Sequence, residues 1–408
     1  MDSPMSVNHG DDHDSGMVTN IDSAGDLVLD ISHETASTKS THQYRVKLSS
    51  LRTNSHYFAS LLAGRFGEGE KIAQEQAQLN EKYGSVAKAP TTELPVVHIK
   101  DVGRISAVKS IEALCLDLLV VLHGKDTSGI PPVANLANLA IVADRFDALD
   151  AVRKYVQRKK IFRTIDSKTT PKADQSLSEE KVRQRLLASL LLDYPPWVEK
   201  YSMRLVTKGW VGKEADENTA LWWDLPSRLE EELAIRREYI LDTIQSTLAR
   251  FFALYTSRER QCRLGYDSSA ACDSYQLGEM VRFFARIGTL RIQGTVFDTA
   301  EPPEPYAGDI FALIESMRQV SEYQIDKFHS HCGFRTRLLP ILDVVTDALQ
   351  YTGICADCWS QNRVEHAWTD AKRPLLWKRQ SYRTRGLGHK EHHAQIKALF
   401  MASEREWA

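Results

Sequence analysis

The sequence contains no run of about 18 consecutive apolar residues, the length that a membrane-spanning helix requires. It also lacks an excess of charge of either sign, because 52 Lys and Arg residues oppose 54 Asp and Glu residues and leave a net charge of −2. A chain built as a whole to bind nucleic acid or an anionic membrane would carry a large positive charge. We therefore expect no membrane contact, and any contact with nucleic acid has to come from a local patch.

Cysteine is scarce, with six residues scattered over a chain of 408. This is too few, and too irregular, for the disulfide framework of a small secreted protein. The N-terminal segment is polar and acidic, and it lacks the apolar stretch of a secretory signal. These features predict an intracellular protein of the nucleus or cytoplasm.

Sequence motifs of common enzyme classes are also missing. The chain has no G-x-x-x-x-G-K-[ST] phosphate loop, no G-x-S-x-G nucleophile elbow and no kinase signature. Gly64, Gly67 and Gly69 follow a predicted helix rather than a strand, and their spacing differs from that of a dinucleotide site. We expect no catalysis.

The patterns that are present predict two domains. Residues 1–24 are rich in Asp, Ser, Gly and His, and we expect them to form a disordered tail. An α+β domain over 25–160 follows, because its strand patterns precede its helical patterns. The segment 161–182 holds few apolar residues and is predicted to be a linker. From 183 to 400 the periodicity is helical, so we expect an all-α domain.

Within these domains the patterns locate particular elements. Strand patterns, in which apolar and β-branched residues alternate or cluster, occur at 26–31, 44–48 and 94–99. The polar stretch 69–92 is expected to lie outside the core. In the second half, Ser227 and Glu230 have the spacing of a capping box and predict the start of a long helix.

Two groups of residues in the first domain resemble the pattern of a BTB/POZ domain. One is the run YRVKLSSLRTNSHYFASLL at 44–62, with its S-S-x-L and S-x-x-F steps, and the other is ADRFD at 143–147. The order of strands and helices is also similar. The resemblance implies a small sheet capped by helical hairpins, which mediates homodimerisation or docks a protein partner.

The helical half resembles the long C-terminal region that follows BTB domains in many uncharacterised filamentous-fungal proteins. The matching runs are LWWDLPSRLEEELAIRREYI at 221–240, CDSYQLGEMVRFFARIG at 272–288, HCGFRTRLLPILD at 331–343 and GICADCW at 353–359. This resemblance implies a protein-interaction role and identifies no ligand.

Phe66 and Glu68 come directly after the first predicted helix of the BTB-like domain. Some BTB proteins contact cullin scaffolds through a hydrophobic-x-Glu step at a similar place, so the resemblance implies a partner-binding role for these two residues. An apolar anchor beside a charge suits the rim of an interface. The alternative function is therefore a substrate adaptor for a cullin ubiquitin ligase, whereas the competing structural explanation packs Phe66 against its own core.

Most of the cysteines lie in the helical half, together with histidines. The candidate metal ligands are Cys262, Cys272, His329, Cys332, Cys355 and Cys358, with His331 as a seventh donor. Zn²⁺ favours four Cys or His ligands in a tetrahedron, and the C-x-x-C pair after Gly353 has the spacing of a zinc loop. Six or seven donors for four places leave the grouping open. Free, buried thiols are the alternative to a structural zinc ion.

The segment 372–397 is basic. Its cationic residues are Lys372, Arg373, Lys378, Arg379, Arg383, Arg385, Lys390 and Lys397, and they alternate with Trp377 and Tyr382. Such a pattern can bind phosphates and stack on bases, so a transcription-associated protein with a C-terminal nucleic-acid contact is a second alternative. Short basic segments more often cover an acidic protein surface or keep a tail in solution, and nucleic acid is not the partner that we expect.

Overall fold

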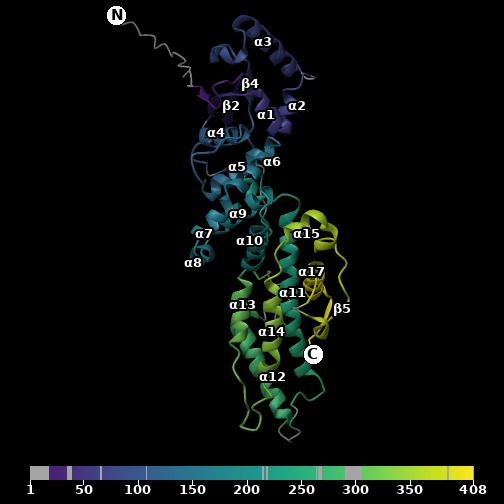
Figure 1. Ribbon diagram of the computed structural model, residues 1–408. Coiled ribbons are helices and arrows are strands. Elements are labelled where there is room, and N and C mark those ends of the chain that lie inside the picture. Colours follow the sequence, from purple (N-terminus) through teal and green to yellow (C-terminus); the bar gives the residue numbers. More distant parts are fainter. Residues whose placement is uncertain are drawn as a thin grey trace, which may run out of the picture. The chain divides into compact units, whose positions relative to one another are not determined.

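The computed structural model describes residues 18–34, 39–64, 67–106, 108–213, 216, 219–262, 264, 269–289, 306–383 and 386–407. The chain divides into two compact units, Met1–Asp174 and Gln175–Ala408. The first unit combines a small sheet with helices, and the second is largely helical (Figure 1). The predicted combination of an α+β part and a helical part is therefore confirmed.

The first unit begins with a strand hairpin and ends in helices. Its strands are β1 (Thr19–Asn20), β2 (Leu27–Glu34), β3 (Lys39–Val46) and β4 (Val96–Ile99). Its helices are α1 (Leu48–Asn54), α2 (His56–Leu61), α3 (Gly67–Tyr83), α4 (Ile111–Leu122), α5 (Val133–Arg145), α6 (Leu149–Arg158), α7 (Ile161–Lys168) and α8 (Pro171–Gln175).

The second unit is built from helices and one small pair of strands. Its helices are α9 (Glu179–Leu191), α10 (Pro195–Lys208), α11 (Leu229–Thr256), α12 (Ser269–Arg286), α13 (Ile310–Arg318), α14 (Arg335–Leu349), α15 (Ala356–Gln361), α16 (Arg363–His366) and α17 (His389–Met401). Its strands are β5 (Leu376–Lys378) and β6 (Glu404–Glu406).

Strand β2 lies inside the sheet of the first unit, whose order is β1-β3-β2-β4. It pairs with β3 in antiparallel and with β4 in parallel orientation. Successive side chains of a strand point to opposite faces, yet Val28 and Leu29 are both buried, so both faces of the sheet are covered. On one face the Tyr44 hydroxyl, beside Leu29, donates to the Glu112 carbonyl of α4.

Helix α3 covers the other face. Its Leu79 belongs to the same buried cluster as Val28 and Leu94. Our expectation that 69–92 lies outside the core is therefore wrong. The stretch is a helix with few apolar residues, and its apolar face packs on the sheet while its polar face meets solvent.

The two segments that resemble a BTB/POZ pattern contact each other. Ser55 is the N-cap of α2, where its Oγ accepts a hydrogen bond from Phe58 N and donates one to the Phe146 carbonyl at 2.6 Å. The rings of Phe58 and Phe146 stack with their centroids 5.3 Å apart. The S-x-x-F step therefore begins a helix and fastens it to the end of α5.

Replacing this serine tests the fastening. Ser55→Ala removes the cap and leaves the buried Phe146 carbonyl without its donor, so we expect the free energy of unfolding to fall by about 1–3 kcal/mol. Ser60→Ala, at an exposed position of the same helix, is the matched control and should change stability little. Urea unfolding of both variants measures the difference, and equal midpoints would contradict the fastening.

The unit boundaries differ from the sequence expectation at two places. Residues 1–17 of the predicted tail lie outside the described residues, but Thr19–Asn20 pair with β3 and Ile21 is buried. The segment 161–182, expected to be a linker, contains α7, α8 and the start of α9. Ile161 and Phe162 are buried and fix α7 to the first unit, although so few apolar residues give little periodicity.

Helix α11 runs through the second unit and packs against α10, α12, α14 and α17 (Figure 1). The predicted capping box at its start is wrong. Ser227 and Arg228 both have positive φ, the helix begins only at Leu229, and no side chain caps it. Glu230 instead accepts two hydrogen bonds from the buried guanidinium of Arg183 on α9. The Glu230 carboxylate therefore pairs with Arg183 and does not form the cap that the local pattern predicts.

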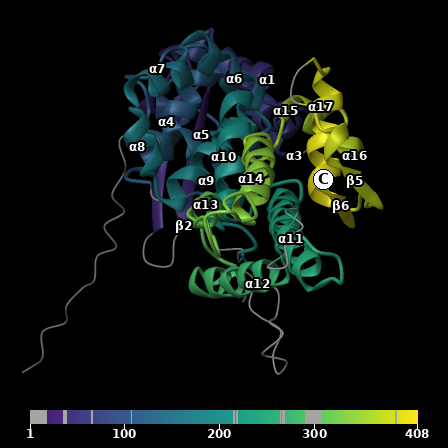
Figure 2. The ribbon, with the colours of Figure 1, turned by 90° about the horizontal axis from the view of Figure 1, so that it is seen from below.

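The second unit is also not purely helical, because β5 and β6 form a parallel pair. Trp377 of β5 is buried against Trp407, with ring centroids 5.1 Å apart. Strands of three residues are too short to show a period of two in the sequence. Figure 2 shows α16, α17, β5 and β6 gathered in one group.

Over the described part of the chain, no helix has both the length and the apolar character that crossing a bilayer demands.

Candidate metal centres

The first candidate centre lies in the interior of the helical unit. Ligand atoms of Cys262, Cys272 and His329 lie within 4.8 Å of one another, and all three residues are buried. Cys332 Sγ is 3.6 Å from Cys262 Sγ, and its thiol is also within hydrogen-bonding reach of Cys272. Three residues thus form the close group, and Cys332 adjoins it through its contacts with the two cysteines; we call the four side chains the Cys3His centre.

Different elements supply these four side chains. Cys262 follows the end of α11, where its backbone N–H donates to the Asp273 carboxylate at 2.9 Å. Cys272 lies in the first turn of α12. His329 and Cys332 belong to one turn, closed by a hydrogen bond from Cys332 N to the His329 carbonyl.

Electrostatics at the Cys3His centre favour a bound cation. The Asp326 carboxylate, 2.8 Å from His329 Nδ1, orients that imidazole and raises its pKa. Burial and the neighbouring thiols raise the pKa of Cys272 above its ordinary range. Crowded thiols cannot all ionise without a compensating positive charge, so a dication binding here would displace their protons.

The second candidate centre joins a loop to the C-terminal helix. Ligand atoms of Cys355, Cys358, His389 and His393 lie within 4.8 Å of one another. His389 Nε2 is 3.4 Å from Cys355 Sγ and 3.3 Å from Cys358 Sγ. The two histidines are four residues apart on α17 and so face the same side of it. We call this set the Cys2His2 centre.

His393 has the properties of a neutral metal ligand. Its ring packs edge-on against His389, with centroids 4.5 Å apart. Burial, together with the neighbouring histidines, lowers its pKa to about 4, so its imidazole is uncharged at neutral pH. Its Nε2 atom is buried and has no hydrogen-bond partner among the described residues. A buried nitrogen lone pair is costly unless something binds it, and a metal ion would do so.

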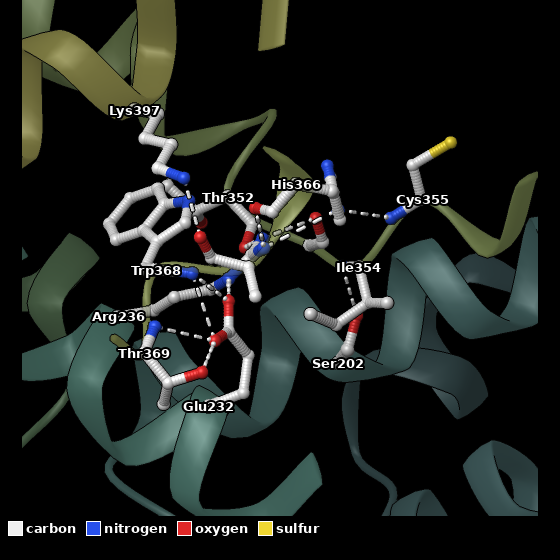
Figure 3. Close-up of polar contacts among 12 residues, drawn as sticks. Ser202, Glu232, Arg236, Thr352, Ile354, Cys355, His366, Trp368, Thr369 and Lys397 are labelled. Atoms are coloured by element: carbon white, nitrogen blue, oxygen red, sulfur yellow. Dashed lines mark hydrogen bonds and ion pairs between the residues drawn. The ribbon is translucent and has the colours of Figure 1, made fainter. Parts of the chain in front are cut away.

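A buried ion pair holds the loop that carries Cys355 and Cys358 (Figure 3). Glu232 and Arg236 lie one turn apart on α11, have 0% and 1% exposed side chains, and are joined by a 2.7 Å bond from Arg236 Nε. Arg236 Nη1 donates to the carbonyls of Thr352 and Gly353, both at 2.9 Å. The guanidinium therefore fixes the backbone immediately before the C-x-x-C pair.

Glu232 fixes the chain on the far side of the same loop. Its carboxylate accepts from the backbone N–H groups of Trp368 and Thr369 and from the Thr369 hydroxyl, each at 2.9 Å (Figure 3). Burial opposes ionisation, but Arg236 and these donors hold the pKa of Glu232 below its ordinary value. The carboxylate is thus a buried anion with its bonding positions filled.

Three further contacts complete the support of the loop. Ile354 N donates to Ser202 Oγ of α10 at 2.7 Å, and Cys355 N donates to His366 Nε2 at 3.3 Å (Figure 3). Burial, with Arg236 next, lowers the pKa of His366 to about 2, so its ring is a neutral acceptor. Gly353 packs so closely on α10 that an added Cβ would overlap the Glu199 carbonyl. The loop is held in place without any contribution from a metal.

Glu232→Gln tests how much the hydrogen-bond network of Glu232 and Arg236 contributes to the stability of the helical unit. Removing the negative charge leaves Arg236 buried without its partner, and we expect a loss of about 3–5 kcal/mol in the free energy of unfolding of the helical unit. Glu231→Gln changes the neighbouring residue, whose carboxylate pairs with Arg228 at the surface, and should have little effect. Chemical denaturation followed by circular dichroism compares the two. Similar stability of both variants would contradict a central role for the pair.

The structure thus divides the six predicted ligands between two sites. His331 is exposed and lies outside both groups. His389 and His393 were not among the predicted ligands, although H-x-x-x-H downstream of C-x-x-C is a spacing that zinc sites use. Both lie inside the basic segment 372–397, where the density of charge dominates the pattern.

The other predicted site residues are not gathered into a site. Phe66 lies outside the described residues, and Glu68 is exposed in the first turn of α3. In the basic segment, Trp377 is buried and the Tyr382 hydroxyl donates to the Asp347 carboxylate at 2.9 Å. Arg373 pairs with Asp242 at 3.1 Å. These groups are engaged within the unit and are not displayed for stacking on bases.

Comparison of the chain with protein-family models, with curated proteins and with solved structures finds no match. The chemistry of the two centres is therefore inferred from the types and positions of their side chains. The Cys2His2 centre brings four sulfur and nitrogen donors together, the number that a closed tetrahedral zinc site uses, and the Cys3His centre brings three together with Cys332 adjoining. Such an arrangement can hold a metal ion and stabilise a fold.

Proposed function

We propose that this chain is an interaction protein whose helical unit is stabilised by two structural Zn²⁺ ions. The convergence of cysteine and histidine side chains at two separate points carries the proposal. Thiolates combined with imidazoles favour Zn²⁺ over Mg²⁺ or Ca²⁺, which require oxygen ligands. Closed four-ligand sites are those of scaffolds rather than of zinc enzymes, which keep one position open.

The first unit supplies the docking function in this proposal. Its β2–β3 hairpin, helical pair α1–α2, parallel strand β4 and following helices support the resemblance to a BTB/POZ domain. Strand β4 is the end strand of the described sheet, and its Val96 is 45% exposed. An exposed apolar residue on an edge strand is a feature of contact surfaces. The occupant is a protein partner or a second copy of the chain.

Metal analysis tests the zinc proposal directly. Protein purified without chelator should contain two equivalents of zinc, one for each centre. His393→Ala removes one ligand of the Cys2His2 centre and should lower the content to one equivalent. His392→Ala is the matched control on the same helix, because His392 packs on Tyr351 and belongs to neither centre.

Elemental analysis by mass spectrometry, combined with the melting temperature before and after chelation, gives the readout. We expect chelation to lower the melting temperature, since metal binding to a site absent from the unfolded chain adds to folding free energy. Less than about a tenth of an equivalent of zinc would contradict the proposal, because structural sites bind it tightly.

A cullin scaffold is the partner that the exposed position of Glu68 favours. Affinity purification of the tagged full chain, followed by mass spectrometry, should recover a cullin, and Glu68→Lys should abolish the recovery through charge reversal at the rim. Glu70→Lys, two residues further along the exposed first turn of α3, is the control and should retain it. Recovery that survives Glu68→Lys would remove this residue from the contact, and absence of a cullin from the wild-type sample would contradict the adaptor function.

A further inference from the structure

A groove lies beside the Cys2His2 centre, and most of its lining residues are not metal ligands. It is a surface cavity of about 210 Å³ between α17, the α15–α16 segment and residues 372–374. Three lysines line it, Lys372, Lys390 and Lys397, and its apolar wall includes Ala394, Ala398 and Met401. We call these six residues the lysine groove.

One face of α17 forms a long wall of this groove. Steps of three or four residues connect Lys390, Ala394, Lys397, Ala398 and Met401, so they share one side of the helix. Lys390 and Lys397 are seven residues apart, about 10 Å along the axis at about 1.5 Å per residue. In a peptide of polyproline II conformation, which has three residues per turn and rises about 3.1 Å per residue, two side chains three residues apart lie on the same side and about 9 Å apart.

The charge of the lysine groove is largely uncompensated. Lys372 and Lys390 form no ion pair within the part of the chain that the structure describes. Lys397 donates to the carbonyls of Glu365 and Ala367, which leaves one of its three N–H groups for another acceptor. Glu365 is the one carboxylate among the residues that line the cavity, and it already accepts a hydrogen bond from Asn362.

The neighbouring centre does not change this balance. Cys358 and His393 line both the cavity and the metal site. Two thiolates cancel the charge of one Zn²⁺ ion, and the two imidazoles are neutral ligands. The metal therefore adds rigidity to one wall of the groove but neither supplies nor removes net charge.

We infer that the lysine groove binds an acidic peptide segment of a protein partner, with two carboxylates three residues apart in a polyproline II conformation. The inference rests on the proposed interaction function and assigns a contact to the helical unit. Leu375 is 77% exposed beside the lining residue Pro374, and Val364 is 89% exposed beside Glu365. Apolar side chains on either side of the peptide's acidic pair would cover Leu375 and Val364. The contact would then combine buried apolar surface with charged pairs, as protein interfaces do.

A nucleic acid fits the groove less well. Binding of single strands relies on exposed aromatic faces, whereas Trp377 is packed against Trp407 and Tyr382 is bonded to Asp347. Alanine and methionine line the wall between the lysines, and no base can stack on them. Arg373 is paired with Asp242 and so is not available to continue a phosphate track from the groove.

Peptide selection tests the inference with the full-length, zinc-loaded protein. One library of ten-residue peptides carries a fixed Glu-x-x-Glu core with random flanks, and the matched library carries Gln-x-x-Gln. We expect enrichment from the Glu library only, with an affinity that falls as salt rises. The Lys372→Glu and Lys390→Glu double variant should bind the selected peptides at least about tenfold more weakly. Lys181→Glu, an exposed lysine of α9 outside the groove, should bind them normally.

Three results would overturn the inference. The first is equal enrichment from the two libraries, and the second is absence of enrichment from both. The third is displacement of the selected peptides by a twenty-nucleotide poly-dT strand, when the double variant no longer binds that strand. The first two leave no role for acidic peptides, and the third assigns the groove to nucleic acid. Zinc content and partner recovery are measured separately. A zinc-loaded chain that recovers a partner but shows no preference for Glu peptides would contradict the groove inference and leave the proposed function standing.

Discussion

The buried pair of Glu232 and Arg236 is the interaction on which the helical unit depends. Taking two charges out of water costs several kcal/mol each, and their attraction offsets this only when every remaining hydrogen-bonding group is satisfied. The chain meets that condition with backbone groups at 352–353 and 366–369, which lie on either side of the C-x-x-C loop. The hydrogen bonds that offset the cost of burying the ion pair also position the loop. The placement of Cys355 and Cys358 therefore depends on the buried charges.

The two candidate metal centres would stabilise different parts of the helical unit. The Cys3His centre gathers the segment after α11, the first turn of α12 and the turn at 329–332. The Cys2His2 centre links the preformed C-x-x-C loop to α17, near the end of the described chain. One ion would thus organise an interior junction, and the other would fasten the C-terminal group of elements and stiffen the wall of the lysine groove.

Local patterns in the sequence predicted local structure well, but they predicted poorly which residues distant in the sequence contact one another. The patterns at 26–31, 44–48 and 94–99 fall on β2, the end of β3 and β4, and the Ser55-x-x-Phe58 step marked a real helix cap. Ser227 failed as a cap because a distant arginine took the carboxylate that the pattern needed. The grouping of thiols into two sites, and the recruitment of His389 and His393, depend on which helices pack together. The H-x-x-x-H spacing marks His389 and His393 as candidate ligands, but the cysteines that they join are decided by the packing of the whole unit.

X-ray absorption at the zinc edge tests the central claim most directly, because it reports the ligand atoms around the metal rather than the amount bound. The two centres together offer five sulfur and three nitrogen donors. The account predicts a mixed shell with sulfur at about 2.3 Å and nitrogen at about 2.0–2.1 Å, in a sulfur-to-nitrogen ratio near five to three. A first shell of oxygen and nitrogen without sulfur would show that the metal binds elsewhere and would contradict the account.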